Sequence, residues 1–201
     1  MEDSSLPLVW RRPSEHDGDR LGDSLDGVVT LESQAERLEV AGAGARRAVI
    51  LHKLMEELLT GELAEELVAS AARARGLLDQ LMPCTETDRV RPDPNEMAAA
   101  ALRTLALPEI AELRPSLVPE IPIWAKDEHG LVAGRADALA INGQRVEAAI
   151  DWKSDVNPTL AVLKAHVQQL QDYPSATHAS RGAIVYLSSG EIVWVRKEAK
   201  E

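Results

Sequence analysis

The hydrophobic periodicity changes near Leu117, and this change constrains the fold more than any other feature of the sequence. From residue 45 to about residue 113, apolar residues recur at the spacing of amphipathic helices. After Leu117, three segments alternate apolar and polar residues with the two-residue period of β-strands, over 118–125, 131–141 and 144–153. A chain with this order of elements is predicted to be an α/β protein.

The pattern also predicts how the remaining elements are arranged. The first helix is expected to end at Thr60-Gly61, the second to cover 63–81, and the third to cover 96–107 with Asn95 as its N-cap. A further helix is expected over 158–173, followed by a closing hairpin over 182–187 and 191–195. Residues 1–44 are predicted to form an acidic linker or arm. The domain would then span 45–201, with a helical part over 45–113 and a sheet and helix over 117–196.

Composition and charge exclude several classes of protein. The chain has 22 basic and 33 acidic residues, a net charge of −11, whereas a protein that captures nucleic acid unaided is basic. A single cysteine, Cys84, excludes an internal disulfide, an iron–sulfur cluster and a structural zinc site built by this chain alone. The sequence has no secretory signal and no apolar run long enough to cross a membrane, so we expect a cytoplasmic protein without a membrane partner.

Two carboxylates and an ammonium group stand on neighbouring predicted strands among small apolar residues. Asp151 and Lys153 share a face of the third strand, since alternate residues of a strand point the same way. A two-residue hairpin at Asn142-Gly143 would put Asp137 on the opposite face from Asp151. A β-bulge, or an odd loop such as one over 142–146, would bring both carboxylates to one face. We expect the common face, because the three groups would then form a site for a hard divalent cation.

Four motifs in a fixed order resemble those of the RecB branch of the PD-(D/E)XK nucleases. They are His52 on a Leu-rich helix, Gly134-Arg135-Ala136-Asp137, Asp151-Trp152-Lys153-Ser154, and Gln169 with Tyr173. Within the branch, the chain is most similar to the C-terminal nuclease domain of AddA-type helicase-nucleases. The resemblance implies a restriction-endonuclease-like αβββαβ core, with a central mixed sheet flanked by helices and with extra helices at the N-terminal side.

The resemblance also implies the roles of the motif residues. His52, Asp137, Asp151 and the backbone carbonyl of Trp152 would ligate Mg²⁺, with Mn²⁺ as the alternative ion. Lys153 would orient or polarise the attacking water.

Three further residues are expected to support this site. Gln169 and Tyr173 lie one turn apart on a predicted helix, where they would brace the site or contact DNA. Glu120, in Pro119-Glu120-Ile121-Pro122, is expected to support the metal ligands rather than to bind the ion.

The expected function is metal-dependent hydrolysis of DNA, exonucleolytic on DNA ends, in double-strand break repair and recombination. The chain has no GxxxxGK[ST] motif, so it is expected to bind no nucleotide and to depend on a helicase motor in the same parent polypeptide or in a partner subunit. Two alternatives are open. One is a catalytically silent module of the same fold that guides DNA or scaffolds a repair complex, although Asp137, Asp151 and Lys153 argue against it. The other is a free-standing nuclease of another branch that acts on RNA or modified DNA.

Overall fold

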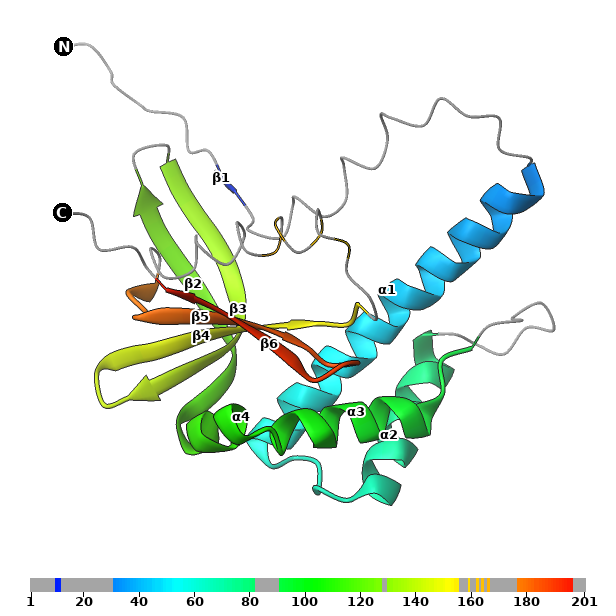
Figure 1. Cartoon of the computed structure of the whole chain (residues 1–201), viewed down its shortest axis with the longest axis horizontal. Helices are drawn as coiled ribbons and strands as arrows, with labels where there is room; N and C mark the ends of the chain where they lie inside the picture. The colour runs from blue at the N-terminus through cyan, green and yellow to red at the C-terminus, as the bar shows by residue number, and fades with distance from the viewer. Residues whose placement is uncertain are drawn as a thin grey trace, which may run out of the picture.

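Helices and strands form two adjoining layers in the computed structural model (Figure 1), which describes residues 10–11, 31–81, 91–127, 130–155, 159, 162, 164, 166 and 177–196. The long helix α1 and the shorter α2, α3 and α4 lie together on one side, and the mixed sheet lies on the other. In chain order the elements are β1 (Trp10–Arg11), α1 (Leu31–Thr60), α2 (Leu67–Leu81), α3 (Pro94–Leu105), α4 (Pro108–Leu113), a 3-10 turn (Arg114–Ser116), β2 (Leu117–Asp127), β3 (Gly130–Asn142), β4 (Arg145–Lys153), β5 (Arg181–Tyr186) and β6 (Glu191–Arg196).

Helix α1 begins earlier than the sequence pattern predicted. It starts at Leu31 and therefore crosses the boundary expected at residue 44, so residues 31–44 are helical and continuous with the first predicted helix. The Ala41-Gly42-Ala43-Gly44 run lowers helix propensity, but it contains no proline to interrupt the helical hydrogen bonds. The end at Thr60 agrees with the prediction, and Gly61 follows with φ +79°, a left-handed conformation that glycine adopts readily.

Helix α3 starts two residues before its predicted start. Asp93 is its N-cap and accepts a hydrogen bond from the backbone N–H of Asn95 at 2.9 Å, so the prediction of Asn95 as the cap is wrong. Pro94 occupies the first turn, where its fixed φ and missing N–H fit the helix start. Helix α2 begins at Leu67 rather than residue 63. Among the described residues, no helix has the length and apolarity needed to span a bilayer.

The sheet is mixed, as the prediction of an α/β fold requires. Its strand order is β2–β3–β4–β5–β6, and only β4 and β5 are parallel along this path. Strand β2 pairs with β3 over most of its length, whereas β4 pairs with β3 only from Ala138 to Asn142. Beyond this point β3 pairs with β1 at Leu131 and Val132. The outer part of the β2–β3 ribbon therefore diverges from β4 and rises away from the rest of the sheet (Figure 1).

A β-bulge in the β3–β4 hairpin sets the register of the candidate site. Asn142 pairs with Arg145, but the register shifts after Ile141↔Val146 so that Ala140 pairs with Ala148 and Glu147 is the extra residue. The shifted register, continued by one residue beyond Ala138↔Ile150, puts Asp137 opposite Asp151. The common face predicted for these carboxylates is confirmed, by a bulge and not by a five-residue loop.

The bulge residue is held by the start of β5. Ser180 Oγ donates a hydrogen bond to the Glu147 carbonyl at 2.6 Å, and Arg181 Nη2 lies 2.8 Å from Glu147 Oε1. The Arg181 guanidinium also lies over the Trp194 ring at 4.3 Å. These contacts fix the bulge from the far side of β4.

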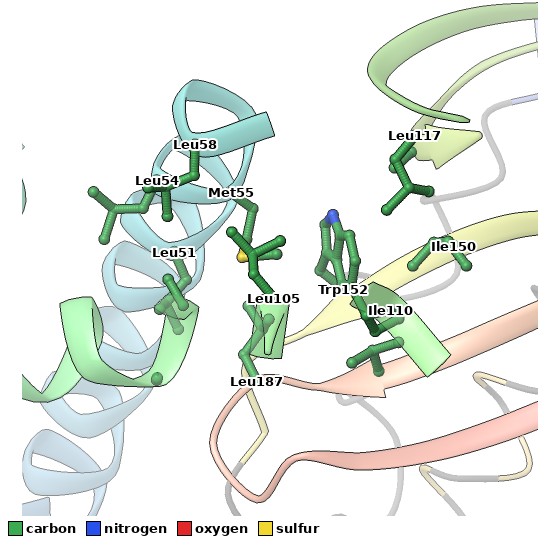
Figure 2. Packing of buried hydrophobic residues seen from close by; sticks show 14 of the residues in the cluster. Leu51, Leu54, Met55, Leu58, Leu105, Ile110, Leu117, Ile150, Trp152 and Leu187 are labelled. Carbon is green, nitrogen blue, oxygen red and sulfur yellow. The ribbon is translucent and has the colours of Figure 1, made fainter. Parts of the chain in front are cut away.

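The main hydrophobic core lies between the helices and one face of the sheet. Figure 2 shows Leu51, Leu54, Met55 and Leu58 of α1 near Leu105 and Leu187, with the Trp152 ring between these residues and the strands. Trp152 and Ile150 point into this core, so Asp151 and Lys153, which alternate with them along β4, point to the opposite face.

An ion pair between a buried glutamate and a partly exposed arginine joins α1 to α2 at the edge of this core. Glu57 is buried, and its two carboxylate oxygens accept hydrogen bonds from Arg73 Nη2 and Nε at 2.6 and 2.8 Å. The Arg73 hydrogen bonds, helped by the charges of Arg73 and Lys53, outweigh the opposing effect of burial and lower the pKa of Glu57 below its ordinary 4.5.

Arg73→Gln should lower the free energy of unfolding at pH 7 by about 1–2 kcal/mol, because Glu57 loses charged hydrogen bonds to a partly exposed partner. Since folding lowers the pKa of Glu57, the pair stabilises fully above pH 4.5 and its contribution is lost as the pH falls through the folded-state pKa. The deficit of the variant should therefore shrink between about pH 5 and about pH 3. Urea denaturation of the parent and of Arg73→Gln across this pH range measures the deficit.

The matched control is Arg91→Gln, which removes an ion pair with the exposed Asp79 and should cost less than about 1 kcal/mol. A deficit for Arg73→Gln that does not change with pH would contradict the role given to Glu57.

Candidate metal centre

Side chains from one helix and two strands converge at the point where β3 leaves β4. One ligand atom each from His52 on α1, Glu120 on β2 and Asp137 on β3 lies within 4.8 Å of the other two. His52 Nδ1 is 3.4 Å from Asp137 Oδ1. An imidazole and two carboxylates at this separation can bind one divalent cation.

The strand register explains why Glu120 belongs to this group. Pro119 pairs with Ala138 and Ile121 pairs with Ala136, so Glu120 lies opposite Asp137. Glu120 has φ +55°, a left-handed conformation that is unfavourable for a residue with a side chain. Strain of this kind concentrates at functional sites.

Asp151 and Lys153 lie beside the three-residue group. Asp151 is 6% exposed, and Lys153 Nζ is 3.3 Å from its Oδ2. That oxygen is buried and has no hydrogen-bond partner among the described residues. The backbone N–H of Trp152, between the two charged residues, donates a hydrogen bond to Asp137 Oδ2 at 2.7 Å. Asp137 is thus held by a main-chain donor on the strand that carries Asp151.

All of these groups line a single open cavity of about 780 Å³. Its walls also include Lys53 and Glu56 of α1, Arg135 of β3, and two residues that follow β4, Asp155 and His166. The cavity therefore contains five carboxylates and a comparable number of cationic or imidazole groups. A single ion bound there would be surrounded mainly by oxygen ligands, with lysine and arginine side chains close by.

Burial and the charges of neighbouring carboxylates raise the pKa of Asp151 and of Glu120. Burial raises the pKa of Asp151 to about 7, with Asp137 adding to the shift and Lys153 opposing it. Burial also raises the pKa of Glu120, and Asp137 and Glu56 add to the effect. For His52, burial lowers the pKa, but the hydrogen bond and charge of Asp137 outweigh it, so the pKa is raised above 6.5. A bound cation would favour the ionised carboxylates, and His52 would bind it in the neutral form.

Arg47 fixes the end of β4 relative to α1. Its Nη1 donates to the carbonyl of Ser154 at 2.9 Å, and its Nε and Nη2 bind the Glu96 carboxylate of α3 at 3.2 and 2.7 Å. Ser188 Oγ donates to the same Ser154 carbonyl at 3.2 Å. Because Arg47 and His52 belong to one helix, the contact ties the position of His52 to that of the Lys153 strand end.

The structure brings most of the predicted site residues together. His52, Asp137, Asp151 and Lys153 line one cavity, and Trp152 contacts Asp137 through its N–H. The role of the Trp152 carbonyl as a ligand stays a prediction. Glu120, expected only to support the site, is placed among the three groups that can hold an ion, while Asp151 stands outside that group. Gln169 and Tyr173 lie outside the described residues.

His166 was not found by sequence reasoning. It is buried, and its Nδ1 is 3.1 Å from the hydroxyl of Tyr186 on β5. Burial, with the charge of Asp155, raises the pKa of Tyr186 to about 12, so the phenol remains protonated. A lone histidine in an apolar helical pattern carries no signal of such a contact.

The strand register would have revealed Glu120, because a count from Asp137 across a regular ladder reaches it.

Comparisons with known proteins add little to this geometry. No protein-family model matches the chain, and none of the curated proteins matches it. A solved structure described as the crystal structure of SSO0001 is 21% identical in sequence, with a TM-score of 0.36 and coverage of 74% of this chain and 74% of its own. A TM-score this low assigns neither a fold family nor a function.

In the presence of EDTA, Asp151→Asn should raise the free energy of unfolding at pH 8 by on the order of 1 kcal/mol, because it removes a buried negative charge. Since folding raises the pKa of Asp151 from 3.8 to about 7, the ionised group costs stability as the pH rises through this interval. The parent should lose stability from about pH 4 to about pH 7, and the variant should lose less. Thermal and urea melts across this range test both statements.

Glu109→Gln, an exposed carboxylate on α4 that does not line the cavity, is the control and should keep the pH dependence of the parent. If Asp151→Asn unfolds the protein or leaves the pH dependence of stability unchanged, the ionised Asp151 carboxylate does not destabilise the folded protein.

Proposed function

We propose that the chain is a metal-dependent nuclease that hydrolyses phosphodiester bonds in DNA. The observation that carries the proposal is the convergence of His52, Glu120 and Asp137 within 4.8 Å, in a cavity that also contains Asp151 and Lys153. A cation site next to a lysine suits phosphodiester hydrolysis, because negative charge develops on the phosphate oxygens and on the leaving group.

The residues fit a hard divalent cation. Asp151 Oδ2 is a buried carboxylate oxygen that lines the cavity and faces the Lys153 ammonium at 3.3 Å, a position from which a carboxylate can bind a metal or a metal-bound water. His52, Glu120 and Asp137, with Asp151, would hold Mg²⁺ or Mn²⁺; oxygen ligands suit both, and one imidazole is compatible with Mn²⁺. Bound there, the ion would activate a water molecule and offset charge on the phosphate.

The protein groups would have distinct tasks. Lys153 would orient the attacking water and stabilise the negative charge of the phosphate, since its ammonium lies beside Asp151 on the cavity wall. The Trp152 N–H would keep Asp137 oriented, because it already occupies one of the two carboxylate oxygens. Arg47 would keep the Lys153 strand end in place relative to His52.

We further propose that the fold is the PD-(D/E)XK core of the RecB branch, similar to the nuclease domain of AddA-type proteins. This proposal is supported by the order of elements, in which helix α1 precedes β2, β3 and β4 and helical residues 162, 164 and 166 precede β5. The motif residues support it too, since His52 is on α1, Asp137 on β3, and Asp151 and Lys153 at the end of β4.

The proposed biological role is exonucleolytic processing of DNA ends during double-strand break repair and recombination. The chain would act with a helicase motor, in the same polypeptide or in a partner subunit, because it has no phosphate-binding ATPase motif and a net charge of −11. The motor would bring single strands to the site. A silent module that only guides DNA is the outcome to be distinguished by experiment.

Asp151→Ala should abolish cleavage of end-labelled DNA in Mg²⁺ or Mn²⁺, because it removes an anionic group from the cation site. Lys153→Ala should lower the rate by about 10²–10³-fold while binding of Mn²⁺ remains close to that of the parent, since the amine acts on water and phosphate. Cleavage assays with EDTA controls, calorimetric Mn²⁺ titration and thermal melts measure the three quantities.

Asp79→Ala, an exposed carboxylate on α2, is the matched control and should cut DNA at the parent rate. Parent protein that binds Mn²⁺ and DNA without cutting either strand would favour the silent module. Asp151→Ala that cuts DNA as well as the parent would remove the basis of the nuclease proposal.

The isolated chain should bind DNA weakly at physiological salt, and its activity should rise when it is joined to its motor. The reason is the net charge of −11, which makes phosphate capture unfavourable over the range of a Debye length, about 8 Å at this ionic strength. Binding measured between low and physiological salt tests the prediction. Tight, salt-resistant binding of duplex DNA by the chain alone would contradict it.

A further inference from the structure

An exposed tryptophan lies on the ribbon that leads away from the candidate metal centre. Trp124 on β2 is 70% exposed, although tryptophan is normally well buried. It follows the exposed Pro122 at the two-residue period of the strand, and Ile123 between them is buried on the other side. The sequence pattern assigned no role to Trp124, and the metal chemistry does not use it.

Strand register places Trp124 on the same face as the ligand group. Pro122 and Trp124 alternate along β2 and therefore share a face, and the Glu120 carboxylate is joined to this face by its ion pair with Arg135. Glu120 lies opposite Asp137, and Pro122 pairs with Arg135, so Arg135 belongs to that face as well. Along the β2–β3 ribbon, the paired positions run from Glu120 and Asp137, through Pro122 and Arg135, to Trp124. At 3.2–3.4 Å per residue, Trp124 is about 13 Å along the strand from Glu120.

Arg135 supplies positive charge between the metal group and the tryptophan. Its side chain is 67% exposed, and its Nε is 2.6 Å from Glu120 Oε2. It also lines the cavity that contains the candidate ligands. A guanidinium binds phosphate oxygens through donors held in a fixed planar geometry. In this protein it lies next to the carboxylates that would bind the metal ion.

We propose that Trp124 and Arg135 form a binding site for single-stranded DNA that continues from the metal centre along the β2–β3 ribbon. Trp124 stacks on a base, and Arg135 contacts the backbone between that base and the reacting phosphate. The identity of the ligand rests on the proposed nuclease function. The distance of about 13 Å between Glu120 and Trp124 suits a short single strand. It corresponds to fewer than four nucleotides, because the rise per nucleotide is about 3.4 Å in a duplex and larger in a stretched strand.

The surroundings favour a nucleic acid over a protein partner. A stable protein interface needs about 800 Å² on each side with a hydrophobic centre. On this face of β2 the described residues offer two exposed apolar side chains beyond Glu120, those of Trp124 and Pro122. A single exposed ring beside an arginine, in line with a cation site, is instead the combination used to hold successive bases and phosphates of a single strand.

The test is a binding titration that does not require cleavage. Fluorescence anisotropy of a labelled oligothymidylate would be measured at low salt, with Ca²⁺ in place of Mg²⁺, for the parent chain, Trp124→Ala and Trp124→Phe. Trp124→Ala should weaken binding by about 5- to 100-fold, the range for loss of one base stack. Trp124→Phe should retain most of the affinity because a ring remains. Arg135→Gln should reduce the slope of log affinity against log salt concentration by about one unit, which corresponds to the loss of about one phosphate contact.

The control is Val68→Ala, which truncates another exposed apolar side chain, 81% exposed on α2, and should bind like the parent. Thermal melts establish that each variant is folded. If Trp124→Ala weakens binding while the parent proves unable to cut DNA, the binding site stands and the nuclease proposal fails. If the parent cuts DNA but Trp124→Ala binds like Val68→Ala, the binding site is wrong and the nuclease proposal stands. A parent chain that binds no single strand at low salt overturns the inference.

Discussion

Trp152 links the hydrophobic core to the candidate metal centre, and the rest of the site depends on where it is held. Its ring is buried in the core formed with α1, α3 and the sheet, while its backbone N–H holds Asp137 at 2.7 Å. Burial of a tryptophan removes roughly 150–250 Å² from water and contributes roughly 4–6 kcal/mol. Met55, three residues after His52, packs in the same core. One packing arrangement thus positions the helix that supplies His52 and the strand that supplies Asp151 and Lys153.

That anchoring allows the protein to tolerate an electrostatic conflict nearby. Glu120, Asp137 and Asp151 approach one another in a partly buried cavity, and burial raises the pKa of Asp151 to about 7 and that of Glu120 above its ordinary range. Glu120 also has an unfavourable backbone conformation, which costs on the order of 1–3 kcal/mol. The core can offset costs of this size, and it is at functional sites that such conflicts are expected to persist.

The sequence allowed much of the sheet to be predicted, because its strands carry a strong two-residue period. The three consecutive strands and the closing hairpin lie where the pattern placed them, to within a few residues. The start of α1 was missed because Ala41-Gly42-Ala43-Gly44 resembles a linker, although a glycine costs a helix only about 1 kcal/mol. The cap of α3 was misplaced by two residues, since Asp93 and Asn95 are both good caps and only the position of Pro94 distinguishes them.

The site was predicted correctly only if the strand register put its residues on the same face of the sheet. The identity of the residues alone did not decide this. Asp137, Asp151 and Lys153 were evident as charges in apolar strands, but their common face required a bulge whose position no local pattern in the hairpin specifies. The contacts that hold the bulge, from Ser180 and Arg181, come from a strand more than thirty residues away in the sequence. The part played by Glu120 was underestimated for a related reason, because its distance from His52 depends on how α1 crosses the sheet.

The negative charge of the chain and the exposed tryptophan are consistent with the proposed binding of single-stranded DNA. Ionic capture is disfavoured for a chain with a net charge of −11, and any affinity from phosphate contacts falls steeply with salt. In the proposed site, stacking of a base on Trp124 would contribute roughly 1–3 kcal/mol and would depend on the face of the ring rather than on charge. A stacked base would therefore hold a short single strand beside carboxylates that repel its phosphates. In the proposed complex, only the segment that reaches the cation site would need a counter-charge, which Arg135, Lys153 and a bound ion would supply locally.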